Sequence, residues 1–246
     1  MGLHKIIRLE SMSRFFDAYE NEKDAVILEV CNNAEKNKIF KDTINNHHSY
    51  MKAKDTCNRR INWLCYETTS GNLVGAVGVN SAILAIGERD KYIGWNGNTK
   101  LRLAGINKLA NNYRFCLIKE NITEKNVGTM VLKRLRKEAQ VTWKNNYGDP
   151  LVLLETLVKP PWSGSVYLAD NWLRLGSTKG YSFSKAPLKL WQQETSARGE
   201  LARNDPNAAI EKYAVGGKMY DIKVSEPKII FVKPLVKNWK EILLKP

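Results

Sequence analysis

The sequence predicts an α/β protein with a mixed, α+β sheet, and three observations lead to that fold class. Strand-like segments over residues 61–69 and 73–86 flank a Gly/Asn turn, which predicts an antiparallel hairpin. A long amphipathic helical pattern follows, and it lies between strand-like segments at 113–118 and 151–158. A strand–helix–strand order of this kind predicts a right-handed crossover between parallel strands. The sheet is therefore expected to contain both antiparallel and parallel strand pairs, with helices layered against it.

Residues 1–45 are charged and mixed in character. Apolar side chains at loose helical spacing, from Ile27 and Leu28 to Ile39 and Ile44, predict a helical segment there. A polar stretch over 45–50 is typical of a loop and separates this segment from the hairpin. After the hairpin, we expect a charged turn at 87–91 and a short helix over 100–110.

The most regular helical pattern begins after Thr123, which has the character of an N-cap. Apolar residues recur every three or four positions from Val127 to Trp143, which predicts a helix of roughly five turns. The other face carries basic side chains that can follow a phosphate backbone, although a charged outer face is ordinarily just solvated. These basic residues are Lys133, Arg134, Arg136 and Lys137.

The C-terminal third has weaker patterns. A short helix is predicted over 166–172, with Gly176 after it, and the strand at 229–232 is expected to complete the core. Residues 185–223 show little periodicity and are interpreted as an insertion or a mobile arm. The predicted organisation is an N-terminal helical extension (1–45), a core domain (46–182), and a basic insertion followed by the final strand (183–246).

The chain is strongly basic. Its 39 Lys and Arg residues outnumber 25 Asp and Glu residues, which gives a formal net charge of +14. A globular protein with this charge attracts polyanions before any specific contact forms. Nucleic acid is therefore the leading partner class, and the alternative is a charge that serves only solubility.

The cysteines and the apolar stretches bear on the cellular compartment. Cys31, Cys57, Cys65 and Cys116 form no CxxC motif and no zinc-type spacing, which favours a reducing, cytoplasmic location without disulfides. Cys65 and Cys116 lie in predicted strands and are expected to be buried thiols. No membrane partner is expected, because no apolar stretch reaches the length of a membrane span and residues 1–20 do not form a signal peptide.

Glu155 is the first candidate for chemistry, because it lies in the middle of the apolar run 151–158. Burying an ionised carboxylate costs several kcal/mol unless it is paired or hydrogen-bonded. A buried Glu155 with a raised pKa would suit a general acid or base. The structural alternative is a glutamate that accepts hydrogen bonds from backbone amides or from Arg114.

Three other polar residues complete a possible catalytic set with Glu155. His48 and Tyr50 lie in the polar loop, and Asp90 lies in the charged turn. Together they could form a nucleophile–base pair or a divalent metal site, although no HxxE or HxH signature supports a metal. The alternative is a pair of exposed histidines and a surface ion pair between Arg89 and Asp90.

Further residues are candidates for binding nucleic acid. Arg89 could hold a phosphate, and Arg114 is a second candidate for a contact to nucleic acid. Lys179 and Tyr181 begin a stretch in which glycine and serine allow close approach to a backbone while aromatic rings can stack on bases.

The order of these elements resembles the GNAT (N-acetyltransferase) fold, a layered arrangement here with an N-terminal helical segment and a C-terminal extension. In that family a Gln/Arg-x-x-Gly-x-Gly/Ala loop at a helix N-terminus binds the pyrophosphate of acyl-coenzyme A. Residues 124–129 read Glu-Lys-Asn-Val-Gly-Thr and contain one of the two expected glycines. Acyl-coenzyme A is therefore not expected as a cofactor, and the cofactor stays unknown.

Five ordered motifs resemble the DruA-like family, which comprises component A of Druantia anti-phage systems and transposon-associated relatives. They span about residues 45–182. The motifs are 47–50 (His-His-Ser-Tyr), 89–95 (Arg-Asp-Lys-Tyr-Ile-Gly-Trp), 111–115 (Asn-Asn-Tyr-Arg-Phe), 155–158 (Glu-Thr-Leu-Val) and 167–178 (Tyr-Leu-Ala-Asp-Asn-Trp-Leu-Arg-Leu-Gly-Ser-Thr). The resemblance implies a DNA-centred defence or mobile-element setting, with a defence-system protein or transposase as a possible partner, but no particular reaction.

Three hypotheses for function follow. The first is a DNA-directed enzyme of a defence or mobile-element system, which modifies or processes DNA at a pocket around Glu155, His48, Tyr50 and Asp90. The second is an acyl-coenzyme A-dependent N-acetyltransferase. The third is a non-catalytic DNA-binding adaptor that recruits a helicase, nuclease or transposase, with Glu155 in a structural role.

Overall fold

The computed structural model describes residues 25–49, 52–53, 59–185, 188–214 and 220–245. Tyr50 lies outside these residues. The chain divides into two compact units. The first comprises the chain up to Val158, Gly164–Gly176 and the chain from Ile230 onward, and the second comprises Lys159–Ser163 and Ser177–Ile229.

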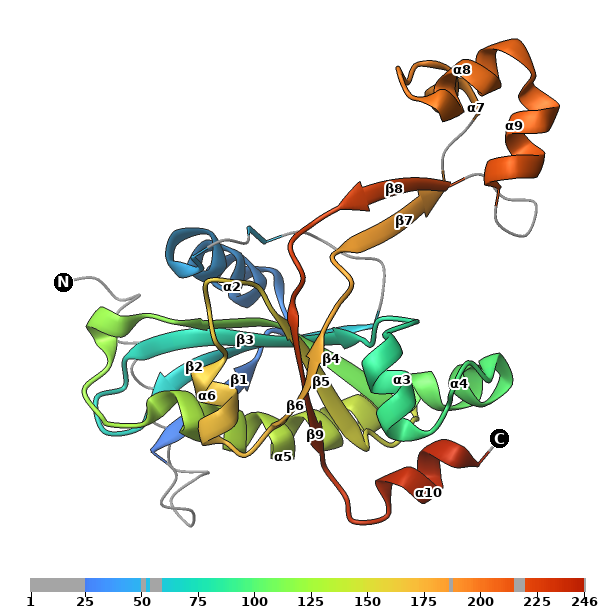
Figure 1. Ribbon diagram of the computed structural model, residues 1–246. Coiled ribbons are helices and arrows are strands. Elements are labelled where there is room, and N and C mark those ends of the chain that lie inside the picture. Colours follow the sequence, from blue (N-terminus) through green and yellow to red (C-terminus); the bar gives the residue numbers. More distant parts are fainter. Residues whose placement is uncertain (1–24, 50–51, 54–58, 186–187, 215–219, 246) are drawn as a thin grey trace. The chain divides into compact units, whose positions relative to one another are not determined.

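The first unit is built on a seven-stranded sheet with the order β1-β2-β3-β4-β5-β9-β6 (Figure 1). Its strands are β1 (Val26–Val30), β2 (Arg60–Glu67), β3 (Leu73–Ser81), β4 (Leu109–Leu117), β5 (Leu153–Val158), β6 (Leu173–Ser177) and β9 (Ile229–Pro234). Strands β1 to β4 pair antiparallel in succession, whereas β4 and β5 pair parallel. The predicted mixed sheet is confirmed.

Helices flank this sheet. The helices of the first unit are α2 (Ala34–His47), α3 (Gly87–Ile93), α4 (Thr99–Gly105), α5 (Val127–Tyr147), α6 (Ser165–Ala169) and α10 (Trp239–Leu244), with short 3-10 turns at Ile106–Lys108 and Lys119–Asn121. Helix α5 connects the parallel strands β4 and β5, so the predicted crossover and the GNAT-like order of elements are present. Figure 1 shows α2 and α5 on opposite faces of the sheet.

The start of α5 differs from the prediction. Its N-cap is Asn126, which has a left-handed backbone (φ 60°), and not Thr123. The Thr123 hydroxyl and amide instead donate hydrogen bonds to Glu67. The helix also runs one turn past Trp143 and ends at Tyr147, and the residue that caps it, Gly148, has a φ of 77° that suits a glycine at a helix C-terminus.

The predicted helix around Ile27 is wrong, because these residues form strand β1. Val26, Ile27 and Leu28 are all buried, and β1 pairs with β2 from Val26–Glu67 to Val30–Trp63. Five apolar-rich residues are too few to distinguish the helical period from the strand period. Only the later part of the region, from Ala34, is helical.

The predicted charged turn at 87–91 is also wrong, because Gly87–Ile93 is helix α3. Arg89 and Asp90 are charged, yet they are buried with Ile93. Smaller differences concern boundaries. The helix expected over 100–110 ends at Gly105, the strand expected from 113 begins at Leu109, and Gly176 lies in strand β6.

Apolar clusters on the sheet hold the first unit together. Phe40 and Ile44 of α2 pack on Leu64, Ala76 and Cys116. Helix α5 buries Val131, Leu135, Ala139 and Trp143 among others. A further cluster joins α3, β4, β5, β9 and α10 through residues such as Trp95, Leu153 and Leu243. Each fully buried large aliphatic side chain contributes about 1.5–3 kcal/mol.

The cysteine prediction is confirmed for two residues. Cys65 and Cys116 lie in β2 and β4, are buried, and are free thiols. Burial raises the pKa of the Cys116 thiol to about 11.

The second unit has its own small core. Strands β7 (Tyr181–Lys185) and β8 (Tyr220–Val224) form an antiparallel ribbon, and three helices lie between them in the chain: α7 (Leu188–Gln192), α8 (Ala197–Asn204) and α9 (Pro206–Tyr213). Trp191, Ala202 and Ala209 are fully buried in this helical part. The region expected to be an insertion or a mobile arm thus contains regular elements that are too short to show periodicity.

Candidate functional site

Glu155 lies in β5 at the last paired position with β4, opposite Asn111. Its side chain is fully buried. Oε2 lies 2.5 Å from Arg89 Nη1, and Oε1 accepts a hydrogen bond from the Ile83 amide at 2.9 Å. Both carboxylate oxygens therefore have partners within the protein.

Arg89 is equally enclosed, with no exposed surface. Its Nε donates to Asp90 Oδ1 at 2.6 Å, and Nη2 donates to the Ile83 carbonyl at 2.7 Å. The guanidinium lies 5.4 Å from the centre of the Trp95 ring, and Asp90 also pairs with Arg102 at 3.4 Å. Arg89 has no surface to offer a DNA phosphate, so its predicted nucleic-acid contact is not retained.

The electrostatics of this buried network have two opposing contributions. Burial raises the pKa of Glu155, whereas the charge of Arg89 and the hydrogen bonds from Arg89 and Ile83 oppose that rise. Arginine remains charged in proteins, and Arg89 Nη1 lies 2.5 Å from Glu155 Oε2, so the guanidinium favours the ionised form of the carboxylate. The structural alternative for Glu155 is a glutamate that accepts hydrogen bonds from backbone amides or from Arg114. The Ile83 amide does donate to Glu155, but the arginine that pairs with Glu155 is Arg89 and not Arg114.

His48 follows the end of α2, where its amide donates to the Ile44 carbonyl. Burial lowers its pKa to about 4, and the neighbouring charge of Arg114 adds to this effect. The imidazole is therefore neutral near pH 7. His48 lies beside Arg114, whereas Asp90 and Glu155 both contact Arg89, so the three described members of the predicted catalytic set have different neighbours.

Arg114 of β4 donates hydrogen bonds to two backbone carbonyls. Its Nη1 donates to the Tyr113 carbonyl at 2.7 Å, and its Nη2 donates to the Lys52 carbonyl at 2.9 Å. The guanidinium also lies 4.9 Å from the centre of the Tyr113 ring. With 6% of its surface exposed, Arg114 is a buried cation that fixes backbone and is not an extended surface contact.

The basic residues of α5 divide into two groups. Arg134 is buried and pairs with Glu138 at 3.1 Å, and Arg136 pairs with Asp170. Lys133 and Lys137 are exposed, as is Lys144 further along the helix. Their spacing places these three lysines on one stripe that spans about 16 Å at the helical rise of about 1.5 Å per residue. We call Lys133, Lys137 and Lys144 the lysine stripe.

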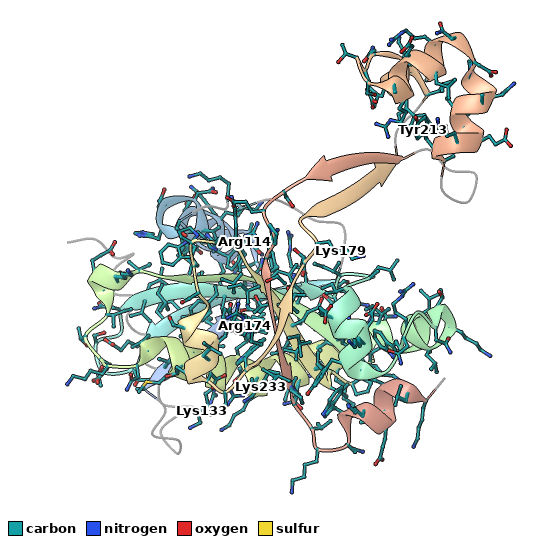
Figure 2. All side chains as sticks on the ribbon, in the orientation of Figure 1. Arg114, Lys133, Arg174, Lys179, Tyr213 and Lys233 are labelled. Carbon is teal, nitrogen blue, oxygen red and sulfur yellow. The ribbon has the colours of Figure 1, made fainter. Side chains whose placement is uncertain are left out.

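Lys233 of β9 is a basic residue that the sequence reasoning missed. Its Nζ donates to the carbonyls of Asp170 and Asn171 at 2.9 and 3.1 Å. Burial lowers its pKa, and the charge of Arg136 acts in the same direction. Figure 2 labels Lys133 and Lys233 with the exposed Arg174 of β6. A lone lysine at the end of a short strand gives no sequence signal of such a position.

Two predicted nucleic-acid contacts lie in the second unit. Lys179 is exposed. Tyr181 begins strand β7, and its side chain lies outside what the structure describes.

Glu67 bears on whether the fold can hold acyl-coenzyme A. It ends strand β2, is fully buried, and accepts hydrogen bonds from the Thr123 and Glu124 amides at 3.1 and 2.8 Å. The hydroxyls of Ser70 and Thr123 donate to it at 2.6 and 2.5 Å. Burial raises the pKa of Glu67, but these hydrogen bonds outweigh burial and bring it to about 2.

The loop before α5 therefore already binds an anion that belongs to the chain. The Glu67 carboxylate occupies the Thr123 amide and the Glu124 amide, and Glu124 is the first residue of the segment that the GNAT resemblance assigns to pyrophosphate. The glycine of this segment, Gly128, has a protein neighbour as well, because a Cβ there would lie 2.8 Å from Val166 Cγ2. The residues present do not fit acyl-coenzyme A at this loop.

Two further searches concern metals and membranes. Among the residues that the structure describes, no group of three or more His, Cys, Asp and Glu side chains could hold a metal ion. Within the same residues, no helix has the length and apolar character needed to cross a bilayer.

Solved structures with a similar fold are acetyltransferases. A candidate ribosomal-protein-serine acetyltransferase of Vibrio cholerae aligns with a TM-score of 0.41 and 11% identity, over 87% of this chain and 95% of its own. The polyamine N-acetyltransferase of Drosophila melanogaster aligns with a TM-score of 0.40 and 7% identity, over 85% and 99%. A candidate acetyltransferase of Sphaerobacter thermophilus aligns with a TM-score of 0.33 and 8% identity, over 85% and 92%. No activity is inferred from these structures.

The comparison with curated proteins finds no match. The comparison with protein families finds one that spans almost the whole chain. The family model described as Druantia protein DruA matches residues 8–245, a range that includes both compact units. The chain therefore belongs to the DruA family of Druantia proteins.

Proposed function

We propose that this DruA-family chain is a DNA-binding component of an anti-phage defence system and that it binds the DNA backbone through the lysine stripe of α5. The observation that carries the proposal is the alignment of Lys133, Lys137 and Lys144 on the outer face of one helix. Each DNA strand carries one phosphate per about 3.4 Å of helix axis, so a stripe of about 16 Å faces about five base pairs.

The net charge of the chain supports the same proposal. At +14, the protein attracts a polyanion over long range, and the exposed lysines then provide contacts without sequence preference.

An adaptor role is favoured over a DNA-modifying reaction at Glu155. A general acid or base must reach the proton that it transfers, within about 2.6–3.2 Å or through one water. The oxygens of Glu155 are instead held by Arg89 and the Ile83 amide inside the sheet. We therefore assign this carboxylate a structural role and propose that catalysis on DNA belongs to partner proteins of the system.

The test is the salt dependence of DNA binding. Lys133→Glu combined with Lys137→Glu should weaken binding to duplex DNA and lower the slope of log K against log salt by about 2, since each phosphate contact contributes about 0.9. Fluorescence anisotropy at several salt concentrations measures both quantities.

A matched control keeps the change in net charge equal. Lys91 and Lys100 are exposed in α3 and α4, so Lys91→Glu with Lys100→Glu alters the charge by the same amount away from the stripe. An equal decrease in the slope of log K against log salt for this control would contradict DNA binding through the lysine stripe. Altered nucleosides in treated DNA that disappear with Glu155→Gln would restore the enzymatic hypothesis.

A further inference from the structure

The connection between β5 and α6, residues 159–164, carries an exposed tryptophan. Trp162 is 48% exposed. All seven tryptophans of the chain lie among the described residues, and each of the other six is at most 9% exposed. Burial of a tryptophan ring removes a large apolar area from water, so these six stabilise the fold. The Trp162 ring is instead left accessible to a ligand.

The backbone around Trp162 is restrained. The dipeptide Pro160–Pro161 precedes it, and both proline rings fix the backbone φ angle. The Trp162 amide donates a hydrogen bond to the Lys159 carbonyl at 3.2 Å, which closes a tight turn. Pro161 and Ser163 are exposed as well, so the indole ring is not recessed between its neighbours. A restrained turn loses less conformational entropy when its side chain binds a ligand.

Basic side chains lie on the segments beside this turn. Lys159 Nζ pairs with a Glu226 oxygen at 3.2 Å, which places the turn next to residues 225–228. Two amides of that segment donate hydrogen bonds to residues 178–180, at 2.6 and 2.9 Å. Lys179, labelled in Figure 2, lies between those two contacts and is exposed. The turn and Lys179 therefore belong to one neighbourhood of the second unit.

An exposed indole beside lysines suits an unpaired nucleobase. Every base has a π face on which an aromatic ring can stack, and cations beside the ring contact the phosphates. In a duplex these faces are covered by the neighbouring base pairs, so only an unpaired base offers one. The Lys159–Glu226 pair does not prevent such a contact. Both side chains are exposed, and an exposed ion pair contributes little, so Lys159 can exchange the carboxylate for a phosphate.

We propose that the second unit binds single-stranded DNA, with Trp162 stacked on a base and with Lys159 and Lys179 beside the phosphates. The proposal rests on the proposed DNA binding of this chain and adds the form of DNA that the second unit recognises. The lysine stripe belongs to the first unit. The two sites can therefore be tested separately.

The experiment measures fluorescence anisotropy of the full chain with three labelled DNAs: an oligothymidylate, an abasic strand of the same length, and a duplex. The abasic strand keeps the phosphates but has no base to stack on. We expect the parent chain to bind the oligothymidylate more tightly than the abasic strand. Trp162→Ala should weaken oligothymidylate binding by about 5- to 150-fold, the range for the loss of one stacked base. Binding of the abasic strand and of the duplex should not change.

Three further variants separate stacking from charge and from a general surface effect. Trp162→Phe keeps an aromatic ring and should retain most of the binding to the oligothymidylate. Lys179→Gln should lower the slope of log K against log salt for the single strand by about 0.7. Leu190→Ala is the matched control, because Leu190 of α7 is 47% exposed in the same unit, and it should leave binding unchanged.

Two results would overturn the proposal. One is equal binding of the oligothymidylate and the abasic strand by the parent chain. The other is a loss of oligothymidylate binding in Trp162→Ala that is no larger than the loss in Leu190→Ala. If duplex binding still depends on Lys133 and Lys137, either result contradicts only this site. A parent chain that binds none of the three DNAs would contradict the proposed function as well.

Discussion

Arg89 and Glu155 form an ion pair in which neither side chain reaches solvent. Desolvation makes such a pair weak evidence for stability as a whole, but removal of one partner leaves an uncompensated buried charge. Asp90, the Ile83 amide and the Ile83 carbonyl complete the hydrogen bonding around it. The pair therefore connects β5 to α3 and to the segment after β3.

Removal of Arg89 should be costly. We expect Arg89→Met to lower the free energy of unfolding by about 3–5 kcal/mol, because Glu155 is then buried without its cation. Glu155→Leu in the same chain should recover part of this loss, since the unpaired carboxylate is gone. Urea denaturation of the two single variants and the double variant measures the coupling. A Glu155→Gln variant with unchanged stability would contradict the structural role.

Glu67 gives a prediction for pH dependence. Its folded pKa of about 2 lies below its ordinary value of 4.5, so its contribution to stability is full above pH 4.5. This contribution should be lost as the pH falls from 4.5 toward 2. Glu67→Gln should be less stable than the parent chain at pH 7, and the difference should shrink in that window. Denaturation midpoints at a series of pH values measure this, and a constant difference would contradict it.

The burial of Glu155 was predictable, but its partner was not. A carboxylate within an apolar run signals a buried acid whatever the fold. Arg89 lies 66 residues away in the sequence, inside a stretch whose charges are typical of an exposed turn. Only the packing of α3 against the sheet brings the two together, and no local pattern encodes that contact.

At the scale of elements, the length of a segment decides how well it could be predicted. Helix α5 has 21 residues, so its apolar period repeats several times and predicts the helix with little ambiguity. Strand β1 and helix α3 have 5 and 7 residues, which is too short for a period to be established. The β2–β3 hairpin was predicted correctly because its turn residues are recognisable in the sequence, in addition to its two strands.

Substitution of two glycines at helix boundaries can distinguish the cost of a strained backbone from the cost of a steric clash. Gly148 ends α5 with φ 77° and has open space where a Cβ would lie. Gly164 precedes α6 with φ 75°, and a Cβ there would lie 2.5 Å from the Phe231 ring. We expect Gly148→Ala to cost about 1 kcal/mol from the left-handed backbone alone. Gly164→Ala should cost clearly more, and equal costs in denaturation experiments would contradict the close packing of α6 on β9.

At the scale of the whole molecule, composition predicts an attraction to polyanions but not where they bind. The excess of 14 positive charges is a property of the entire chain, whereas the lysine stripe depends on which lysines the fold leaves exposed. Arg89, Arg114 and Arg134 illustrate the difference, because the fold buries all three. Charge counting therefore does not indicate which of the basic residues face solvent.

The division into two units leads to a prediction about their independence. The second unit begins and ends near Thr178 and Lys228, where the Thr178 amide donates to the Lys228 carbonyl at 2.8 Å and the Lys228 amide donates to Thr178 Oγ1 at 2.9 Å. Because these ends are already in hydrogen-bond contact, an Asn-Gly turn can replace residues 179–227.

The shortened chain should keep a cooperative thermal transition within about 5 °C of the parent midpoint, because the first unit retains its own buried clusters. Circular dichroism on heating measures this midpoint. If the lysine stripe alone binds duplex DNA, the slope of binding against salt should also stay the same, because Lys133, Lys137 and Lys144 remain in place. A smaller slope with an unchanged midpoint would assign phosphate contacts to the second unit, where Lys179 is one of the exposed lysines that can be substituted next in the full chain.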